Sequence, residues 1–268
     1  MVRVGLVGCG TIGSQLARAL QRDYHHAARI VALNDCNHRQ AVLLQRRLTG
    51  HPPICSLPAL VRKSQMVLEA ASAEVSAEVV TRCLRAHRDV MVMSVGGLLT
   101  DRMWQRLARR SRGRVFIPSG ALAGIDGVKA MAVGTIRRVS LTTRKPPQAL
   151  SSAPYVRRRR LRLERRTRPS VVFEGSPREV VSAFPQNTNV AAALTLASGA
   201  ADSRTRIRVV ADPTIRSNVH ELDIESDCGR IHCRIESRPS ANPKTSEIAV
   251  RSAVATLARL FGRVSIGT

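Results

Sequence analysis

The chain is poor in aromatic residues, acidic residues and long apolar runs. Phe, Trp and Tyr make up 3% of its 268 residues, so few side chains are available to stack on nucleic-acid bases. No apolar run approaches the roughly 18 residues that a membrane span requires. The six cysteines form no C-x-x-C pair and do not cluster with histidine. This predicts free thiols in a cytoplasmic protein and no metal site.

The scarcity of acidic residues leaves a large positive charge. Asp and Glu number 19 against 43 Lys and Arg, for a formal net charge of +24, and only four of the basic residues are lysines. The densest cluster, Arg157–Arg168, lies between predicted strands and is expected in an exposed loop. Such a cluster attracts polyanions, but no helix-turn-helix, zinc-finger or RNA-binding signature accompanies it. We therefore predict a solvated arginine-rich surface and no specific nucleic-acid partner.

What the sequence does contain is a glycine-rich loop in the context of a dinucleotide-binding fold. Gly8-Cys9-Gly10-Thr11-Ile12-Gly13 follows an apolar run, residues 2–7, and opens a stretch with helical periodicity, residues 14–22. Gly8 allows the tight turn, Gly10 lets the backbone approach a pyrophosphate, and Gly13 lets helix and strand pack closely. Thr11 and Ile12 begin the helix, whose N–H groups and dipole favour phosphate. The loop predicts a nicotinamide cofactor.

Asp35 follows the second predicted strand, residues 30–34, about 20 residues after the loop. A carboxylate at this position binds the ribose hydroxyls of NAD and repels the 2′-phosphate of NADP. His38 and Arg39 follow closely, and they are able to accommodate such a phosphate. We expect NAD to be preferred, with NADP as the alternative.

The first 119 residues alternate short apolar strands with helical patterns. Beyond the first two strands, further strands are predicted at 66–70, 90–94 and 114–118, with helices at 73–88 and 100–112. This alternation predicts a Rossmann-type doubly wound parallel sheet, and thus a dinucleotide-binding domain over residues 1–119. Ser94–Gly97 is expected to lie under the nicotinamide, although a Gly-Gly turn explains it nearly as well.

The pattern changes after residue 119. Strands are predicted at 137–144, 205–211, 219–226 and 230–236, the last two joined by a hairpin at 227–229, with helices at 123–133, 177–183 and 189–198. This predicts a second α/β domain over residues 120–243, built on a mixed, largely antiparallel sheet. A last helix within residues 244–268 is expected to return to the first domain.

Seven motifs of the second domain resemble the L-aspartate dehydrogenase family. They occur in the family's order and spacing, and with the glycine loop they cover nearly the whole chain. The Arg157–Arg168 stretch departs most from the family pattern. The motifs are SGALAGID (119–126), LTTRKPP (141–147), FEGS (173–176), FPQNTNVAA (184–192), ADP (211–213), NVHE (218–221) and NPKTS (242–246).

The resemblance implies NAD- or NADP-dependent oxidation of L-aspartate to iminoaspartate. That imine hydrolyses to oxaloacetate and ammonia or is passed on for quinolinate and NAD synthesis. The resemblance also implies a homodimer with a Rossmann domain and a catalytic α/β domain that carries the dimer contacts. His220 matches the family's catalytic histidine, while Ala121 and Asn189 match positions that contact the cofactor near its nicotinamide half. Histidine suits proton transfer because its pKa lies near neutrality.

Aspartate carries two carboxylates, so its pocket needs cations or N–H donors. Lys244, beside Asn242 and Thr245 at the start of the last helix, is the first candidate, and Arg144 and Lys145 are the second. A solvated lysine explains Lys244 nearly as well, and a simple helix cap explains Thr245.

Two alternatives remain at this point. One is another two-domain reductase, such as a homoserine dehydrogenase or a dihydrodipicolinate reductase, although the motifs at 218–221 and 242–246 resemble neither. The other is a non-catalytic dinucleotide-binding protein with a basic surface. The intact glycines and the retained His220 argue against lost catalysis.

Overall fold

The computed structural model describes residues 1–185, 189–240 and 246–267, which form two compact units. Unit 1 holds Met1–Pro118 and Val250–Ile266, and unit 2 holds Ser119–Ala249 and the last residues of the chain. No helix in the described part of the chain is long and apolar enough to cross a membrane.

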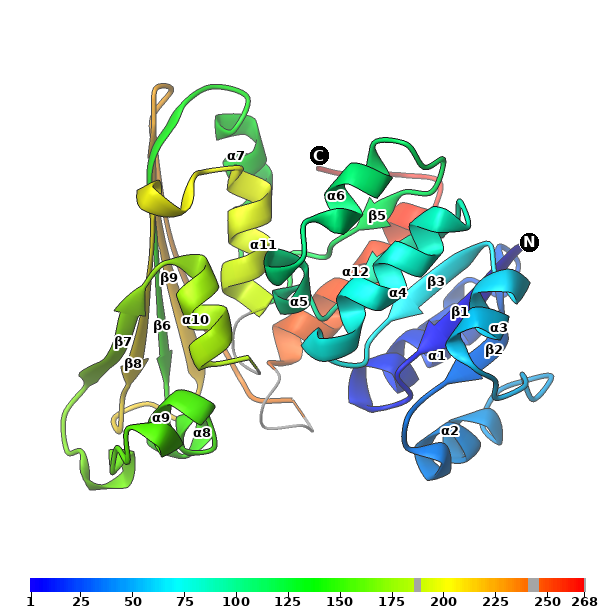
Figure 1. Ribbon diagram of the computed structural model, residues 1–268, viewed down its shortest axis with the longest axis horizontal. Coiled ribbons are helices and arrows are strands. Elements are labelled where there is room, and N and C mark those ends of the chain that lie inside the picture. The colour runs from blue at the N-terminus through cyan, green and yellow to red at the C-terminus, as the bar shows by residue number, and fades with distance from the viewer. Residues whose placement is uncertain (186–188, 241–245, 268) are drawn as a thin grey trace. The chain divides into compact units, whose positions relative to one another are not determined.

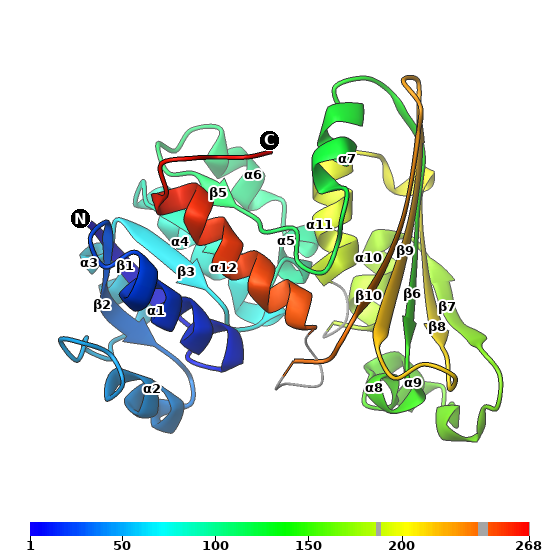
Figure 2. The same cartoon turned by 180° about the vertical axis from the view of Figure 1, so that it is seen from behind.

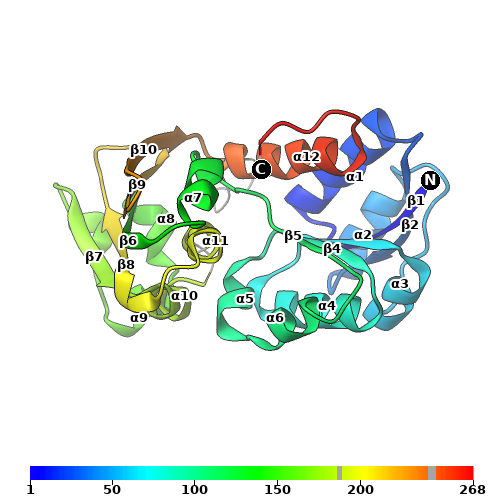
Figure 3. The same cartoon turned by 90° about the horizontal axis from the view of Figure 1, so that it is seen from above.

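Unit 1 is a parallel sheet covered on both faces, which confirms the predicted doubly wound fold. Its strand order is β2-β1-β3-β4-β5, and every pairing is parallel. Figure 3 shows α1 and α12 on one face of this sheet and α3 and α4 on the other. The elements are β1 (Val2–Val7), α1 (Thr11–Asp23), β2 (Ala28–Asn34), α2 (His38–Gln45), α3 (Leu57–Lys63), β3 (Met66–Glu69), α4 (Ala73–Arg85), β4 (Asp89–Val92), α5 (Gly96–Thr100), α6 (Met103–Ala108), β5 (Val115–Phe116) and α12 (Glu247–Phe261).

The core under α1 and α12 follows from the apolar spacing of these helices. Leu16 and Leu20 of α1 lie one turn apart, as helical periodicity requires, and both are buried in the same cluster as Leu6 of β1. Ala253 and Leu257 of α12 are fully buried in this cluster as well. The C-terminal helix therefore supplies part of the core of unit 1.

Unit 2 is built on a mixed sheet with the order β10-β9-β6-β8-β7. Three pairings are antiparallel and one, β6 with β8, is parallel, as predicted for a largely antiparallel sheet. Figures 1 and 2 show α7, α10 and α11 together on one face. The elements are α7 (Ile125–Met131), β6 (Ile136–Lys145), α8 (Pro147–Ser151), α9 (Pro154–Arg158), η1 (Leu163–Arg165), β7 (Ser170–Gly175), α10 (Pro177–Ala183), α11 (Asn189–Ser198), η2 (Asp202–Arg204), β8 (Thr205–Ala211), β9 (Asn218–Ser226) and β10 (Arg230–Ser237).

The structure corrects two sequence predictions. The helix expected over 100–112 is shorter: α6 covers only Met103–Ala108, and the separate α5 ends at Thr100 before it. Between the two, Asp101 Oδ1 accepts a hydrogen bond from Met103 N, the first N–H of α6, at 2.7 Å. The strand β7 was not predicted, and it is an edge strand that pairs only with β8.

The arginine cluster lies between β6 and β7 in an exposed segment, as predicted. Arg157–Arg160 are exposed, while Val156 and Leu163 on either side are buried in the core of unit 2. Two apolar side chains therefore anchor the segment and leave the guanidinium groups in solvent.

Candidate functional site

The glycine loop of unit 1 joins β1 to α1 and needs its glycines for steric reasons. Gly8 has φ +92°, and a Cβ there would lie 2.5 Å from the carbonyl of Ala70. A Cβ at Gly13 would lie 1.9 Å from the carbonyl oxygen of Gly8. A side chain at either position would push the start of α1 away from the sheet.

The N-terminus of α1 is open to an anion. A Cβ at Gly10 would meet nothing closer than Gln40 Oε1, at 3.7 Å, so a ligand can approach the backbone here. In the described part of the chain no side chain caps this helix, and its first turn, which includes Thr11 and Ile12, contains no acidic residue. These features fit the phosphates of a dinucleotide, which N–H groups and the helix dipole stabilise.

The carboxylate of Asp35 is held beside this loop at the end of β2. Its Oδ2 accepts a hydrogen bond from Cys9 N at 2.6 Å, and its Oδ1 accepts one from Asn37 N at 2.7 Å. The structure thus brings the glycine loop together with Asp35, which lies 22 positions after Gly13 in the sequence. Lone pairs of the carboxylate are left for further donors. Burial, and then the charge of Asp35, raises the pKa of the Cys9 thiol to about 12, so this cysteine is not a nucleophile.

Glu69, which sequence reasoning missed, organises the same edge of the sheet. It is fully buried at the end of β3, where its two oxygens accept hydrogen bonds from Ala71 N at 2.8 Å and Ser94 N at 3.0 Å. Burial raises the pKa of this carboxyl despite those bonds. In the sequence, Glu69 could have been noticed as a carboxylate at the end of an apolar predicted strand.

The Ser94–Gly97 segment continues into α5, whose packing accounts for one of its glycines. A Cβ at Gly97 would lie 2.1 Å from the carbonyl oxygen of Ala73 in α4. Close packing of α4 and α5 therefore requires Gly97. This agrees with the alternative that Ser94–Gly97 is a structural Gly-Gly turn.

His220 lies in the third position of β9 and is 3% exposed. It is paired in register with Thr143 of β6, and its Nδ1 lies 3.1 Å from Thr143 Oγ1. The hydroxyl can donate to the ring or accept from it, depending on the tautomer. Either way, Thr143 fixes one ring nitrogen and orients the imidazole.

The expectation that His220 titrates near neutrality is wrong for the free protein. Burial, followed by the positive charge of Lys145, lowers the pKa of His220 to about 3. The imidazole is therefore neutral at physiological pH. A neutral imidazole can accept a proton, but it is a weak base until its surroundings change.

Arg144 and Lys145, which the sequence ranked equally as substrate ligands, lie on opposite faces of the sheet. Lys145 is 5% exposed, and burial lowers its pKa to about 8. Arg144 Nε lies 3.0 Å from Glu221 Oε2, and Glu221 also pairs with Arg234 on β10. Arg144 therefore belongs to an ion-pair network, and only Lys145 shares a face with His220.

The other predicted residues of unit 2 lie on separate elements. Ala121 is buried in the core just before α7, and Asn189 is exposed at the first position of α11, a helix that packs on α7. Asn242, Lys244 and Thr245 lie outside the described residues. Within the described residues, no group of three or more His, Cys, Asp and Glu side chains is arranged to hold a metal ion.

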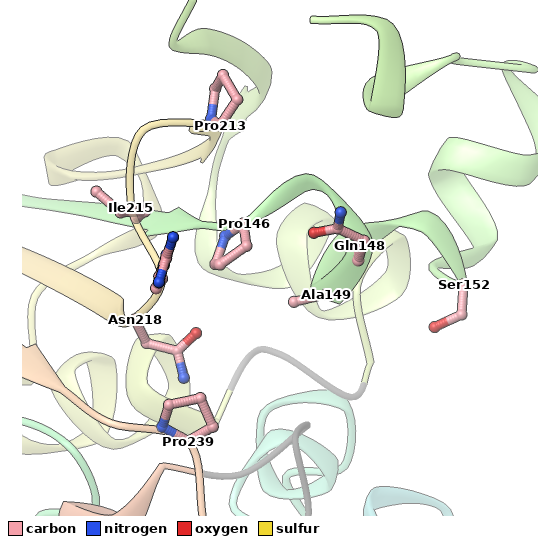
Figure 4. Close-up of a pocket in the computed structure, with 9 residues that line it drawn as sticks. Pro146, Gln148, Ala149, Ser152, Pro213, Ile215, Asn218 and Pro239 are labelled. Atoms are coloured by element: carbon pink, nitrogen blue, oxygen red, sulfur yellow. The ribbon is translucent and has the colours of Figure 1, made fainter. Parts of the chain in front are cut away.

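A pocket of about 570 Å³ opens in unit 2 next to these strands (Figure 4). Pro146, which follows Lys145, and Asn218, which lies two residues before His220 on β9, both line it. Figure 4 shows the Asn218 amide between Pro146 and Pro239. Among the described residues, its lining includes Pro146, Gln148, Ala149, Ser152, Pro213, Ile215, Arg216, Asn218 and Pro239.

Comparison with known proteins identifies relatives over the whole chain. Residues 126–260 match the family described as "Aspartate dehydrogenase, C-terminal", and residues 8–117 match "Homoserine dehydrogenase, NAD binding domain". The chain is 40% identical over 273 residues to an L-aspartate dehydrogenase of Methanosarcina barkeri, with 100% of both chains covered. It is 36% identical over 267 residues to one of Bradyrhizobium diazoefficiens, covering 100% of this chain and 94% of the relative.

The fold has matches among solved structures. An aspartate dehydrogenase from Thermotoga maritima superposes with a TM-score of 0.74 at 24% identity, covering 100% of both chains. A homoserine dehydrogenase from Thiobacillus denitrificans reaches 0.59 at 13% identity, covering 98% of this chain and 76% of that one. These likenesses show the fold, and the full-length sequence matches show the family: the chain belongs to the L-aspartate dehydrogenase family.

Proposed function

We propose that this protein is an NAD(P)-dependent L-aspartate dehydrogenase. The reaction oxidises L-aspartate to iminoaspartate, reduces the cofactor by two electrons and releases one proton. Water then converts the imine to oxaloacetate and ammonia. The observation that carries the proposal is a buried histidine, His220, at the polar end of a sheet in a chain that matches L-aspartate dehydrogenases over its full length.

In this proposal unit 1 binds the cofactor and unit 2 carries out the chemistry. The pyrophosphate is held by the N–H groups of the loop and of the first turn of α1, and Asp35 binds the ribose hydroxyls, so NAD is preferred over NADP. Ala121 and Asn189 contact the nicotinamide half. The residues of the loop are Gly8, Gly10, Thr11, Ile12 and Gly13.

A bound nicotinamide would supply the hydride acceptor for the oxidation at C2 of the substrate. His220, neutral and oriented by Thr143, accepts the proton that the substrate ammonium must lose. In the hydrolytic step the same imidazole activates water for attack on the imine carbon. Asn242, Lys244 and Thr245 are proposed to contact the substrate carboxylates.

Three further features belong to this proposal. The enzyme acts as a homodimer in the cytoplasm, where its product supplies pyridine nucleotide synthesis. We place the dimer contacts in unit 2. Light scattering should give about twice the chain mass of 29.2 kDa.

The test is NADH formation at alkaline pH with L-aspartate, D-aspartate, L-glutamate and L-homoserine, beside the variant His220→Ala. We expect activity with L-aspartate alone, and a loss of about 100-fold or more in kcat in the variant. Activity with homoserine would place the chain among the related reductases. Cofactor binding without turnover of any substrate would indicate a non-catalytic dinucleotide-binding protein.

A further inference from the structure

The pocket of unit 2 is lined by residues from separate segments of the chain. Pro146 lies between β6 and α8, Pro213 follows β8, and Asn218 begins β9. Each of these three residues belongs to a different motif of the family resemblance, LTTRKPP, ADP and NVHE. Motifs that are far apart in the sequence therefore meet at this pocket (Figure 4). Its volume of about 570 Å³ lies in the range of sites that bind small molecules.

Asn218 is a buried polar residue whose side chain has no protein partner. It is 4% exposed, and its backbone pairs with Ser237 of β10. In the described part of the chain its carboxamide makes no hydrogen bond, and Figure 4 shows this amide between Pro146 and Pro239 of the lining. Burying a polar group without a partner costs stability, and asparagine is unfavourable in strands. Asn218 is therefore better explained by a ligand than by the fold.

The charges around the pocket favour an anionic ligand. Arg216 lines the pocket, is exposed, and forms no ion pair with the described residues. None of the described lining residues is acidic. Two carboxylates of neighbouring segments have other partners. Asp212 Oδ1 accepts from the N–H and the hydroxyl of Thr214, at 3.0 and 2.6 Å, and Glu236 Oε1 accepts from Ser217 Oγ at 2.5 Å.

Asn218 and Arg216 complement each other as donors to a carboxylate. The amide NH₂ group of Asn218 donates hydrogen bonds without a charge of its own, and the guanidinium of Arg216 adds a positive charge and further donors. The remaining lining includes the apolar side chains of Pro146, Pro213 and Ile215. Apolar surroundings lower the local dielectric constant and strengthen both interactions.

We propose that this pocket is a carboxylate-binding site, in which the Asn218 amide and the Arg216 guanidinium hold one carboxylate of a dicarboxylic substrate. The inference rests on the proposed function and deepens it, because the ligand is then L-aspartate. Asn218 lies on β9, the strand that also carries His220, so the substrate is held on the strand of the proposed proton acceptor. Succinate, a dicarboxylate without an amino group, should bind in the same pocket.

The experiment compares full-length wild type with Asn218→Leu, Arg216→Gln and the control Arg137→Gln. Leucine has the same branching as asparagine but no hydrogen-bonding group. Arg137 is an exposed arginine of the same unit that forms no ion pair with the described residues. The readouts are the dissociation constant of succinate from calorimetry, KM for L-aspartate at saturating NAD, KM for NAD, and the thermal midpoint.

For Asn218→Leu we expect the succinate constant and KM for L-aspartate to rise about tenfold or more, because hydrogen bonds to a charged group are lost. The thermal midpoint should stay level or increase, since a buried amide without a partner is removed. Arg216→Gln should raise the same two constants, by less at high salt than at low salt, because exposed charges are screened. KM for NAD should stay close to the wild-type value in both variants, and Arg137→Gln should match wild type.

The outcomes separate this inference from the proposed function. If wild type oxidises L-aspartate but Asn218→Leu and Arg216→Gln keep the succinate constant and KM, the carboxylate site is overturned and the function stands. If wild type does not oxidise L-aspartate but binds succinate, and both variants lose that binding, the function is overturned and the site stands. A lowered thermal midpoint in Asn218→Leu, with losses in proportion to unfolding, would make Asn218 a structural residue and overturn the inference. Equal losses in Arg137→Gln would reduce the effect of Arg216 to overall charge and likewise overturn it.

Discussion

The glycine loop of unit 1 and the polar end of the sheet in unit 2 are built from different parts of the chain. In unit 1 the binding groups are backbone N–H groups, made accessible by glycines that leave room. In unit 2 the proposed site is built from side chains around His220 and Thr143, held on a face that is otherwise hydrophobic core. A backbone site depends on local conformation, whereas a buried side-chain site depends on which strands become neighbours.

The largest expected effect tests the backbone-built site. Gly8→Ala should lower the free energy of unfolding by about 3 kcal/mol and abolish detectable NADH binding, because left-handed strain is added to contact with Ala70 at 2.5 Å. Chemical denaturation and NADH fluorescence titration measure both effects. Gly50→Ala is the matched control, with φ +77° and no heavy atom within 4 Å; strain alone should cost about 1 kcal/mol. Equal costs at both positions would contradict the role of close packing.

The second prediction tests desolvation in unit 2. His220 has a pKa of about 3 in the folded protein, compared with an ordinary value of 6.5. Above pH 6.5 neither state is protonated, but as the pH falls below 6.5 the unfolded chain binds a proton that the folded protein does not, so stability decreases. At pH 5 this contribution amounts to about 2 kcal/mol. Chemical denaturation at pH 7 and pH 5 measures the free energy of unfolding at each pH. Its decrease on going to pH 5 should be smaller in His220→Gln than in wild type. Equal decreases would mean that His220 is not buried as described.

The third prediction concerns Asp35, whose carboxylate accepts a hydrogen bond from Cys9 N of the glycine loop. Asp35→Ser removes the acceptor for Cys9 N and Asn37 N and the charge that repels a 2′-phosphate. KM for NAD should rise about tenfold, roughly 1.4 kcal/mol, while KM for NADP should fall. Steady-state kinetics with both cofactors measure the change. Asp101→Ser, which removes a carboxylate that accepts a hydrogen bond from Met103 N, should leave the cofactor preference unaltered.

The smallest effect is expected from the neighbour of His220. Glu221 lies on the opposite face of β9, where it pairs with Arg144 and Arg234. Glu221→Gln should cost about 1 kcal/mol or less of stability, since partly exposed ion pairs contribute little. The kcat should change less than twofold, against the large loss in His220→Ala. A large loss in Glu221→Gln would show that both faces of β9 take part in the chemistry.

Much of this architecture was predictable from local patterns. The spans of β1, β8, α10 and α11 agree with their predicted ranges, because each combines regular periodicity with clear ends. The bounds of the helix expected over 100–112 were wrong: the backbone is extended at Asp101, whose carboxylate accepts from the first N–H of α6, within an unbroken helical pattern. The strand β7 escaped prediction because it lies at a sheet edge, where only one side is paired and periodicity is weaker.

The candidate sites divide in the same way. The glycine loop and Asp35 could be identified from the sequence because the turn, the helix start and the strand end are local features with fixed spacing. Sequence could not rank Lys145 above Arg144, because a shift of one residue in register exchanges the faces of the sheet. Burial lowers the pKa of Lys145 to about 8, and burial followed by the charge of Lys145 lowers that of His220 to about 3. Both causes exist only once β6 and β9 have paired and the helices cover them.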